Sequence, residues 1–138
     1  MQLHASCCAR KGLGVLIMGS SGSGKSSLLL RLLERGFGLV ADDRVVLAGL
    51  DACAPPVLAG ILEVRGLGLT RLAYLRTTRL ALVVELGTEQ RLPTRETHPK
   101  TGLPILSLRP HCPYGPERVS LALRVAAGRA TQVFGAFV

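Results

Sequence analysis

GVLIMGSSGSGKSSLLLRLLERG, residues 14–36, is the stretch of sequence that decides the fold. It opens on a short apolar run, 14–18, which suits a buried strand. Leucines at helical spacing follow over 28–33, and Gly36 is the residue type that most often closes a helix. A glycine-rich loop joins the two. The sequence therefore predicts a strand, a glycine loop and a helix in succession.

The loop matches the phosphate-binding pattern G-x-x-x-x-G-K-[ST] at every position. Glycines allow backbone N–H groups to wrap phosphate oxygens, because a Cβ would block the approach or forbid positive φ angles. The helix N-terminus adds partial positive charge, the lysine is expected to reach the β and γ phosphates, and the serine hydroxyl can ligate Mg²⁺. The predicted binding residues are Gly19, Ser20, Ser21, Gly22, Ser23, Gly24, Lys25, Ser26 and Ser27.

Two adjacent carboxylates, Asp42 and Asp43, follow the apolar run 39–41 and so stand at the expected end of a strand. In open α/β sheets, ligands gather at the carboxyl ends of strands. A carboxylate there can hold Mg²⁺ or take a proton from an attacking hydroxyl. Glu85, which also follows an apolar run, is an alternative metal-site acid.

Further strands are expected on each side of the aspartate pair, near Ile61 and over 80–86. The polar segment 87–102 is predicted to form a long surface loop. The apolar spacing of 116–130 fits both a strand and a helix, and the proline at its start favours a helix. Without repeats or a long linker, a single domain over 1–138 is expected.

Composition limits the function classes. The chain is 48% hydrophobic and 19% charged, which is typical of a globular protein, and it has no apolar run of the roughly 18 residues that a membrane span needs. The net charge of +8 favours phosphate-bearing ligands, but without a Lys/Arg run nucleic acid is not expected as a partner. The four cysteines, Cys7, Cys8, Cys53 and Cys112, have no metal or redox spacing and predict inert thiols in the cytoplasm.

Three motifs in this order resemble the catalytic domain of HPr kinase/phosphorylase, which phosphorylates a serine of the phosphocarrier protein HPr. They are the phosphate loop, VADD at 40–43 and EVRGLG at 63–68. The segment SLRPHCPYGPE at 107–117 is similar to the family's C-terminal V-R-P-G segment. The resemblance implies an α/β fold, with a P-loop kinase domain whose mixed β-sheet is flanked by helices, as in the HPr kinase and PEP carboxykinase catalytic cores.

The resemblance also implies residue roles. Asp42 would transfer the proton, while Asp43 would join Ser26 in a metal site. His4 matches a family histidine upstream of the first strand, and Arg91 an active-site arginine in a loop. The implied catalytic residues are thus Asp42, Lys25, Arg91 and His4, and the implied metal-site residues are Ser26, Asp43 and Glu63.

The expected function is that of an ATP- and Mg²⁺-dependent protein serine kinase that acts on HPr, with phosphorolysis of phosphoserine as the reverse reaction. The resemblance further implies a homo-oligomer, a hexamer. Two alternatives share the phosphate loop: a small-molecule P-loop kinase and a nucleotide-binding regulatory domain. Neither would need VADD and EVRGLG together in this order.

Overall fold

A computed structural model describes residues 1–89 and 95–137. It has two helices, α1 (Lys25–Leu33) and α2 (Gly115–Ala126), and a short 3₁₀ turn, Pro56–Leu58. The main sheet contains β1 (Gln2–Leu3), β2 (Ser6–Arg10), β3 (Leu13–Gly19), β4 (Gly38–Ala41), β5 (Val45–Ala48), β6 (Asp51–Cys53), β9 (Thr78–Leu86) and β10 (Ile105–Leu108). A separate hairpin is formed by β7 (Ile61–Val64) and β8 (Gly68–Arg71).

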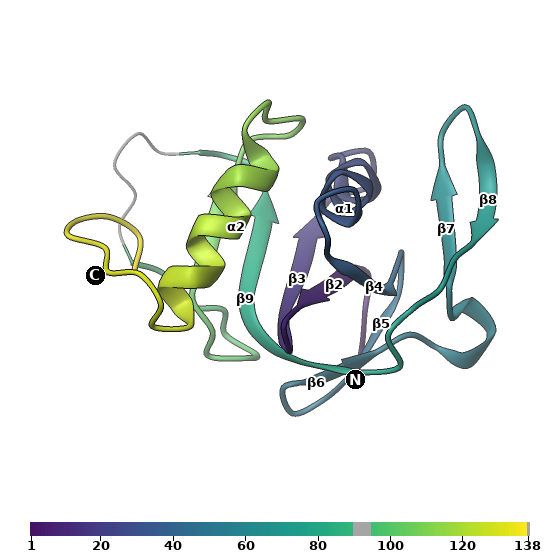
Figure 1. Cartoon of the computed structure of the whole chain (residues 1–138), viewed down its shortest axis with the longest axis horizontal. Coiled ribbons are helices and arrows are strands. Elements are labelled where there is room, and N and C mark those ends of the chain that lie inside the picture. Colours follow the sequence, from purple (N-terminus) through teal and green to yellow (C-terminus); the bar gives the residue numbers. More distant parts are fainter. Residues whose placement is uncertain (90–94, 138) are drawn as a thin grey trace.

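The main sheet is mixed, as predicted. Its strand order is β1-β5-β6-β9-β3-β2-β4, and β10 pairs with β9. β3 runs parallel to β9, whereas β2 is antiparallel to both β3 and β4. The strands β3 and β4, which α1 connects, are therefore parallel to each other with β2 between them (Figure 1).

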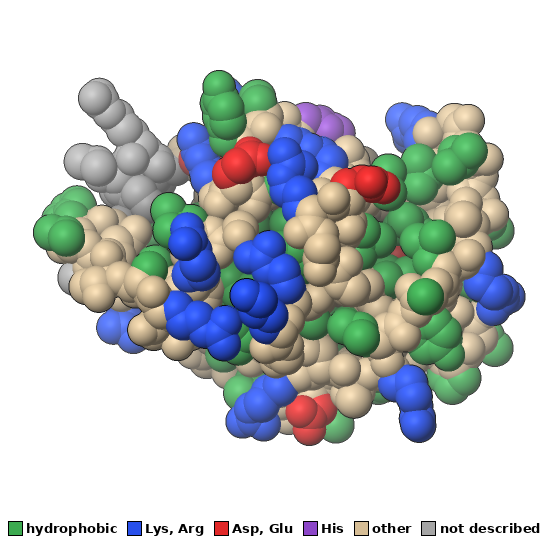
Figure 2. Space-filling model, in the orientation of Figure 1, with side chains coloured by type: hydrophobic (Ala, Val, Ile, Leu, Met, Phe, Trp, Pro, Cys, Tyr) green, Lys and Arg blue, Asp and Glu red, His purple; other side chains and the backbone are tan. Residues whose placement is uncertain are grey.

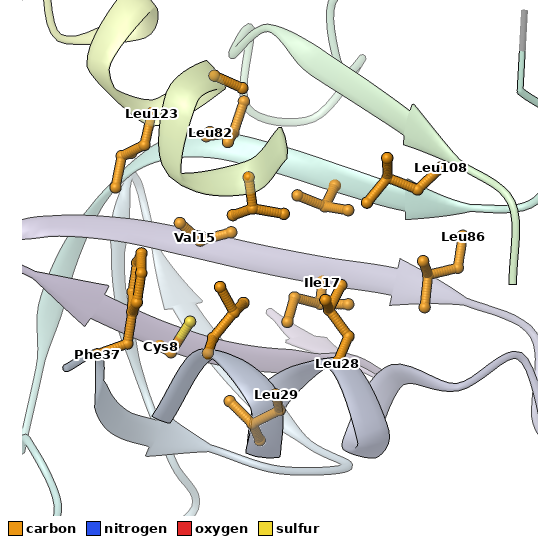
Figure 3. Close-up of a cluster of buried hydrophobic side chains, with 14 of the residues drawn as sticks. Cys8, Val15, Ile17, Leu28, Leu29, Phe37, Leu82, Leu86, Leu108 and Leu123 are labelled. Carbon is orange, nitrogen blue, oxygen red and sulfur yellow. The ribbon is translucent and has the colours of Figure 1, made fainter. Parts of the chain in front are cut away.

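Alternation along β3 builds a core on each face of the sheet. Val15 and Ile17 pack in a cluster with the buried leucines of α1 and α2, as Figure 3 shows. Leu16, between them, joins a second cluster to which β1, β5 and β6 contribute. Both helices thus pack on one face of the sheet, and the opposite face is covered by strands.

Each predicted element exists. The strand at 14–18 is β3, the strands beside the aspartate pair are β4 and β5, and the ambiguous C-terminal segment is the helix α2. α1 closes at Gly36, whose φ is +91°. The N–H of Gly36 donates to Leu33 O and that of Phe37 to Leu32 O, both at 3.2 Å, which is the Schellman arrangement. In the described part of the predicted surface loop 87–102, the β-pairing consists of one isolated bridge between Thr97 and Pro104.

The strands β1, β2, β6, β8 and β10 were not predicted individually. β2 is the most consequential of them, because it lies inside the sheet and carries the buried run from Ser6 to Ala9. Among the described residues, no helix is long and apolar enough to cross a membrane.

Candidate phosphoryl-transfer site

Four strands bring the predicted site residues to one edge of the main sheet. The carboxyl ends of the parallel strands β3 and β4 lead into the phosphate loop and into Asp42 and Asp43. β2 runs the opposite way, so its amino end, with His4 and Ser6, lies at the same edge. The carboxyl end of β9, at Leu86, is beside Gly19. The site therefore depends on pairings between residues far apart in the sequence.

The phosphate loop has the shape of an anion cradle. Gly22 and Gly24 have φ of +80° and +98°, angles that favour glycine. A Cβ on Gly19 would lie 2.5 Å from Ser23 Oγ, so the loop closes too tightly for any side chain there. Ser23 Oγ is buried and has no hydrogen-bond partner within the described residues. No side chain caps the first N–H groups of α1. These uncapped donors fit phosphate oxygens.

Lys25 crosses the loop. Its Nζ donates to Gly19 O at 2.8 Å and to Ser20 O at 3.0 Å, and the side chain is largely buried. Both acceptors are neutral carbonyls, and no salt bridge to Lys25 is formed within the described ranges. The ammonium charge is therefore left uncompensated beside the loop's N–H groups, which again suits an anionic ligand.

Asp42 is the centre of a buried polar cluster. Its Oδ1 accepts hydrogen bonds from Ser6 Oγ at 2.8 Å and from Ser26 Oγ at 2.9 Å, and Ser26 Oγ also lies 3.2 Å from Oδ2. Only 7% of Asp42 is exposed, and Ser6 is fully buried. The carboxylate thus fixes the hydroxyl of the loop serine that would ligate a metal ion. Ser6 was not among the predicted site residues.

Asp43 differs from Asp42 in both its partner and its exposure. Its φ is +70°, in the left-handed region, which aspartate adopts more readily than most residues. Its Oδ1 lies 2.7 Å from Nε2 of His4, and the two side chains are 62% and 53% exposed. The prediction grouped Asp43 with Ser26, whereas in the structure Ser26 bonds to Asp42 and Asp43 bonds to His4.

A pocket of about 350 Å³ connects the phosphate loop to His4. It is lined by His4, by Met18 and Gly19 at the end of β3, and by residues 85–88 at and after the end of the neighbouring strand β9. Glu85, the alternative acid of the sequence analysis, therefore contributes to this pocket. The pocket leaves space for a second reactant next to a phosphate held by the loop.

Other predicted residues are not gathered at this edge. Glu63 is exposed on the β7–β8 hairpin, which Figure 1 places to the side of α1. Its neighbour Leu62 points the other way, into the core. Arg91 lies outside the described residues. In the ranges 1–89 and 95–137, no group of three His, Cys, Asp or Glu side chains is arranged to hold a metal ion. The metal role of Glu63 therefore stays a prediction.

The cysteines next to Ser6 are inert, as predicted. All four cysteines are free thiols, and Cys7 and Cys8 are fully buried in β2. Burial raises the pKa of the Cys8 thiol to about 12, although Arg10 opposes the shift. Burial, with the neighbouring Cys8, also raises the pKa of Cys7 well above its usual value. Neither thiol supplies a thiolate for chemistry at neutral pH.

Comparisons with known proteins match the chain to one family. Residues 1–96 match the family described as HPr Serine kinase C-terminal domain. Over 95% of its length the chain is 39% identical to HPr kinase/phosphorylase of Aromatoleum aromaticum, of which it covers 48%. Over 86% of its length it is 42% identical to HPr kinase/phosphorylase of Cupriavidus metallidurans, of which it covers 38%. The chain thus spans less than half of each of these curated relatives.

The fold is also similar to a solved structure, that of the Hpr(Ser) kinase/phosphatase from Coxiella burnetii. The TM-score is 0.80, the alignment covers 94% of this chain and 92% of that chain, and the sequence identity is 23%. This likeness shows that the α/β arrangement with a mixed sheet and helices is a known one.

Proposed function

Since the chain belongs to the HPr serine kinase C-terminal domain family, we propose that it transfers the γ-phosphoryl group of ATP to a serine of the phosphocarrier HPr. Phosphorolysis of phosphoserine would be the reverse reaction. The observation that carries the proposal is the pair of contacts beside the phosphate loop, Ser26 with Asp42 and His4 with Asp43. These contacts place two carboxylates next to one phosphate site, Asp42 on the side of the metal ion and Asp43 on the side of the acceptor serine.

The first carboxylate serves the phosphate side. The N–H groups of the loop and of the first turn of α1 bind the phosphates, and Lys25 neutralises their charge. Mg²⁺, when bound, would balance the charge on the phosphate oxygens, and Ser26 would hold the ion through its Oγ. Asp42 keeps the Ser26 hydroxyl hydrogen turned toward itself, so that the oxygen lone pairs are free for the metal.

The second carboxylate serves the acceptor side, which differs from the role that the family resemblance implies for it. Asp42 is buried and its Oδ1 already accepts two hydroxyl hydrogens, whereas Asp43 is exposed and borders the solvent side. A serine that arrives on a protein approaches from solvent. We therefore assign Asp43 to take the serine proton, with His4 orienting its carboxylate, and to return the proton in the reverse reaction.

The surface charge and the free thiols support an anionic ligand and a reducing compartment. Figure 2 shows Lys and Arg side chains gathered over the two helices, and the net charge is +8. Such a surface attracts anionic ligands. Four free thiols are typical of a reducing compartment, so we propose the cytoplasm. We also propose one domain over 1–138 and a homo-oligomer, a hexamer by resemblance. Glu63 and Arg91 keep their implied roles as predictions.

The test of the activity is the transfer of label from γ-labelled ATP, with Mg²⁺, to HPr from the same cell. Acid-stable label on HPr is expected, as for phosphoserine, and the Lys25→Ala variant should abolish it. Lys100→Ala is the matched control, since Lys100 is exposed in the polar segment. Label on a small molecule instead would support the small-molecule kinase, and nucleotide binding without any transfer would support the regulatory domain.

The division of roles has its own test. Asp43→Asn should leave Mg-ATP affinity nearly unchanged and lower both reaction directions by about 10²- to 10⁴-fold, because one proton acceptor serves both. Asp42→Asn should instead raise the Mg²⁺ concentration required, with activity partly recovered at high Mg²⁺. A Mg²⁺ titration of both variants decides the matter. Rescue of Asp43→Asn but not of Asp42→Asn would reverse the roles, to those that the resemblance implies.

A further inference from the structure

The loop that follows β10 is fixed onto α1 by an arginine in the last turn of that helix. Arg31, in α1, donates from Nη1 to Cys112 O at 2.9 Å and from Nη2 to Pro113 O at 2.6 Å. Two donors on one planar guanidinium hold the loop in a single orientation. The N–H of Gly115 also donates to Cys112 O at 3.1 Å. His111 and Cys112 line a small crevice together with Gly24 and Ser27, so this loop lies beside the phosphate loop.

His111, the residue before Cys112, is held in an unfavourable backbone conformation. Its φ is +58°, which is uncommon for a residue with a side chain. The ring rests on the phosphate loop: a Cβ on Gly24 would lie 3.1 Å from its Cε1 and 3.2 Å from its Nδ1. Backbone strain that the surroundings maintain beside a ligand site is a reason to look for a role in binding.

His111 and His4 lie on opposite sides of the phosphate loop. His111 borders a crevice with Leu28 and Leu108, which belong to the core cluster on the helical face of the sheet. The pocket beside His4 includes Met18, which packs against the cluster on the other face. The loop is thus bracketed by one histidine on each side.

In-line phosphoryl transfer determines which histidine lies on the acceptor side and which lies on the nucleotide side. The attacking and leaving oxygens lie on opposite sides of the transferred phosphorus. If the acceptor serine is deprotonated at Asp43 beside His4, the leaving nucleotide extends away from His4, toward His111. The crevice beneath the ring is only about 10 Å³, so a ligand would meet the exposed surface of the imidazole rather than enter below it.

We propose that His111 contacts the nucleoside of bound ATP and that Arg31 is the positioning residue that holds it there. The inference rests on the proposed function and adds a determinant of nucleotide specificity to it. It predicts that the protein distinguishes ATP from tripolyphosphate, which offers the same phosphates without a nucleoside, and that this preference depends on the loop.

The experiment compares the affinities for Mg-ATP and Mg-tripolyphosphate by calorimetry, in the wild type and in His111→Gly. Glycine accepts a φ of +58°, so this variant removes the ring without adding strain. Stacking of a base on an aromatic ring accounts for about a tenfold change in affinity. We expect ATP binding to weaken by about that factor and tripolyphosphate binding to stay the same.

Arg31→Ala should reduce the preference for ATP to the same extent, and the double variant should lose no more. A purely structural role of Arg31 would lower thermal stability without changing the ratio of the two affinities. Arg35→Ala is the matched control, because Arg35 follows the same helix and pairs with the exposed Glu117. Unchanged ATP affinity in His111→Gly, or equal weakening for both ligands, would overturn the inference. A wild type that binds neither ligand would instead refute the proposed function.

Discussion

Removal of the Ser6 hydroxyl tests the buried cluster on which the site depends. In Ser6→Ala, Asp42 loses a 2.8 Å hydrogen bond from a fully buried donor. A hydrogen bond to a charged group contributes about 1.5–3 kcal/mol. For a chain of this length we expect the midpoint of thermal unfolding to fall by about 5–15 °C.

The interaction itself is measured by a double-mutant cycle with Asp42→Ala. That single variant should cost more, because it leaves the buried Ser6 hydroxyl without an acceptor, a penalty of about 1–3 kcal/mol. The variant Ser6→Ala/Asp42→Ala has no such orphan. Its loss of unfolding free energy should therefore be smaller than the sum of the two single losses, by about 1.5–3 kcal/mol.

Urea unfolding at 25 °C supplies the three free energies, with a constant m-value as the check that unfolding stays two-state. Asp42→Asn serves as the control, because the amide oxygen can still accept from Ser6. Additive losses, within about 0.5 kcal/mol, would show that Ser6 and Asp42 do not interact in solution. Asp42 could then not be the residue that holds the Ser26 hydroxyl in place.

Three further predictions concern the glycines and the thiols. Gly24→Ala should abolish Mg-ATP binding, because φ is +98° there and the new Cβ would lie 3.1 Å from the imidazole of His111. Gly36→Ala is the control, because φ is +91° but the space around it is open. It should cost about 1 kcal/mol of stability and leave the affinity for Mg-ATP, measured by calorimetry, unchanged. Equal affinities in both variants would contradict this account of the loop. At pH 8 the half-buried Cys53 should react with a thiol reagent well before Cys7 and Cys8. Because the folded-state pKa of Cys8 is raised from 9.0 to about 12, stability is retained below pH 9 and lost as the pH rises toward 12. Cys8 alone should contribute a slope of up to about 1.4 kcal/mol per pH unit, in addition to that of Cys7. The slope should therefore decrease by about that amount in Cys8→Ala, as urea midpoints from pH 7 to 11 would show.

The features that could be predicted from the sequence are those encoded locally. The apolar run of β3, the glycine spacing of the loop and the leucines of α1 lie within 14–36 and need no distant partner. The aspartate pair was placed correctly at a strand end for the same reason, since the apolar run 39–41 precedes it directly.

Contacts between distant segments could not be predicted in this way. β2 reads SCCAR, without a β-branched or aromatic residue, and it is a strand because β3 and β4 pair with its two sides. Ser6 consequently gave no sign of its contact with Asp42. The partners of the two aspartates were equally hidden, because those of Asp42 come from β2 and α1 and that of Asp43 from the segment before β2.

The position of β2 between β3 and β4 has a consequence for protein engineering. The segment 14–43 looks like a portable nucleotide-binding unit, but its two strands share no hydrogen bonds. Excised alone, it would present open strand edges, which promote self-association. A graft onto another scaffold would have to carry the first ten residues, as well as β9, which borders β3 on its other side. A transplantable module therefore needs at least residues 1–86, and β2 must be supplied together with the phosphate loop.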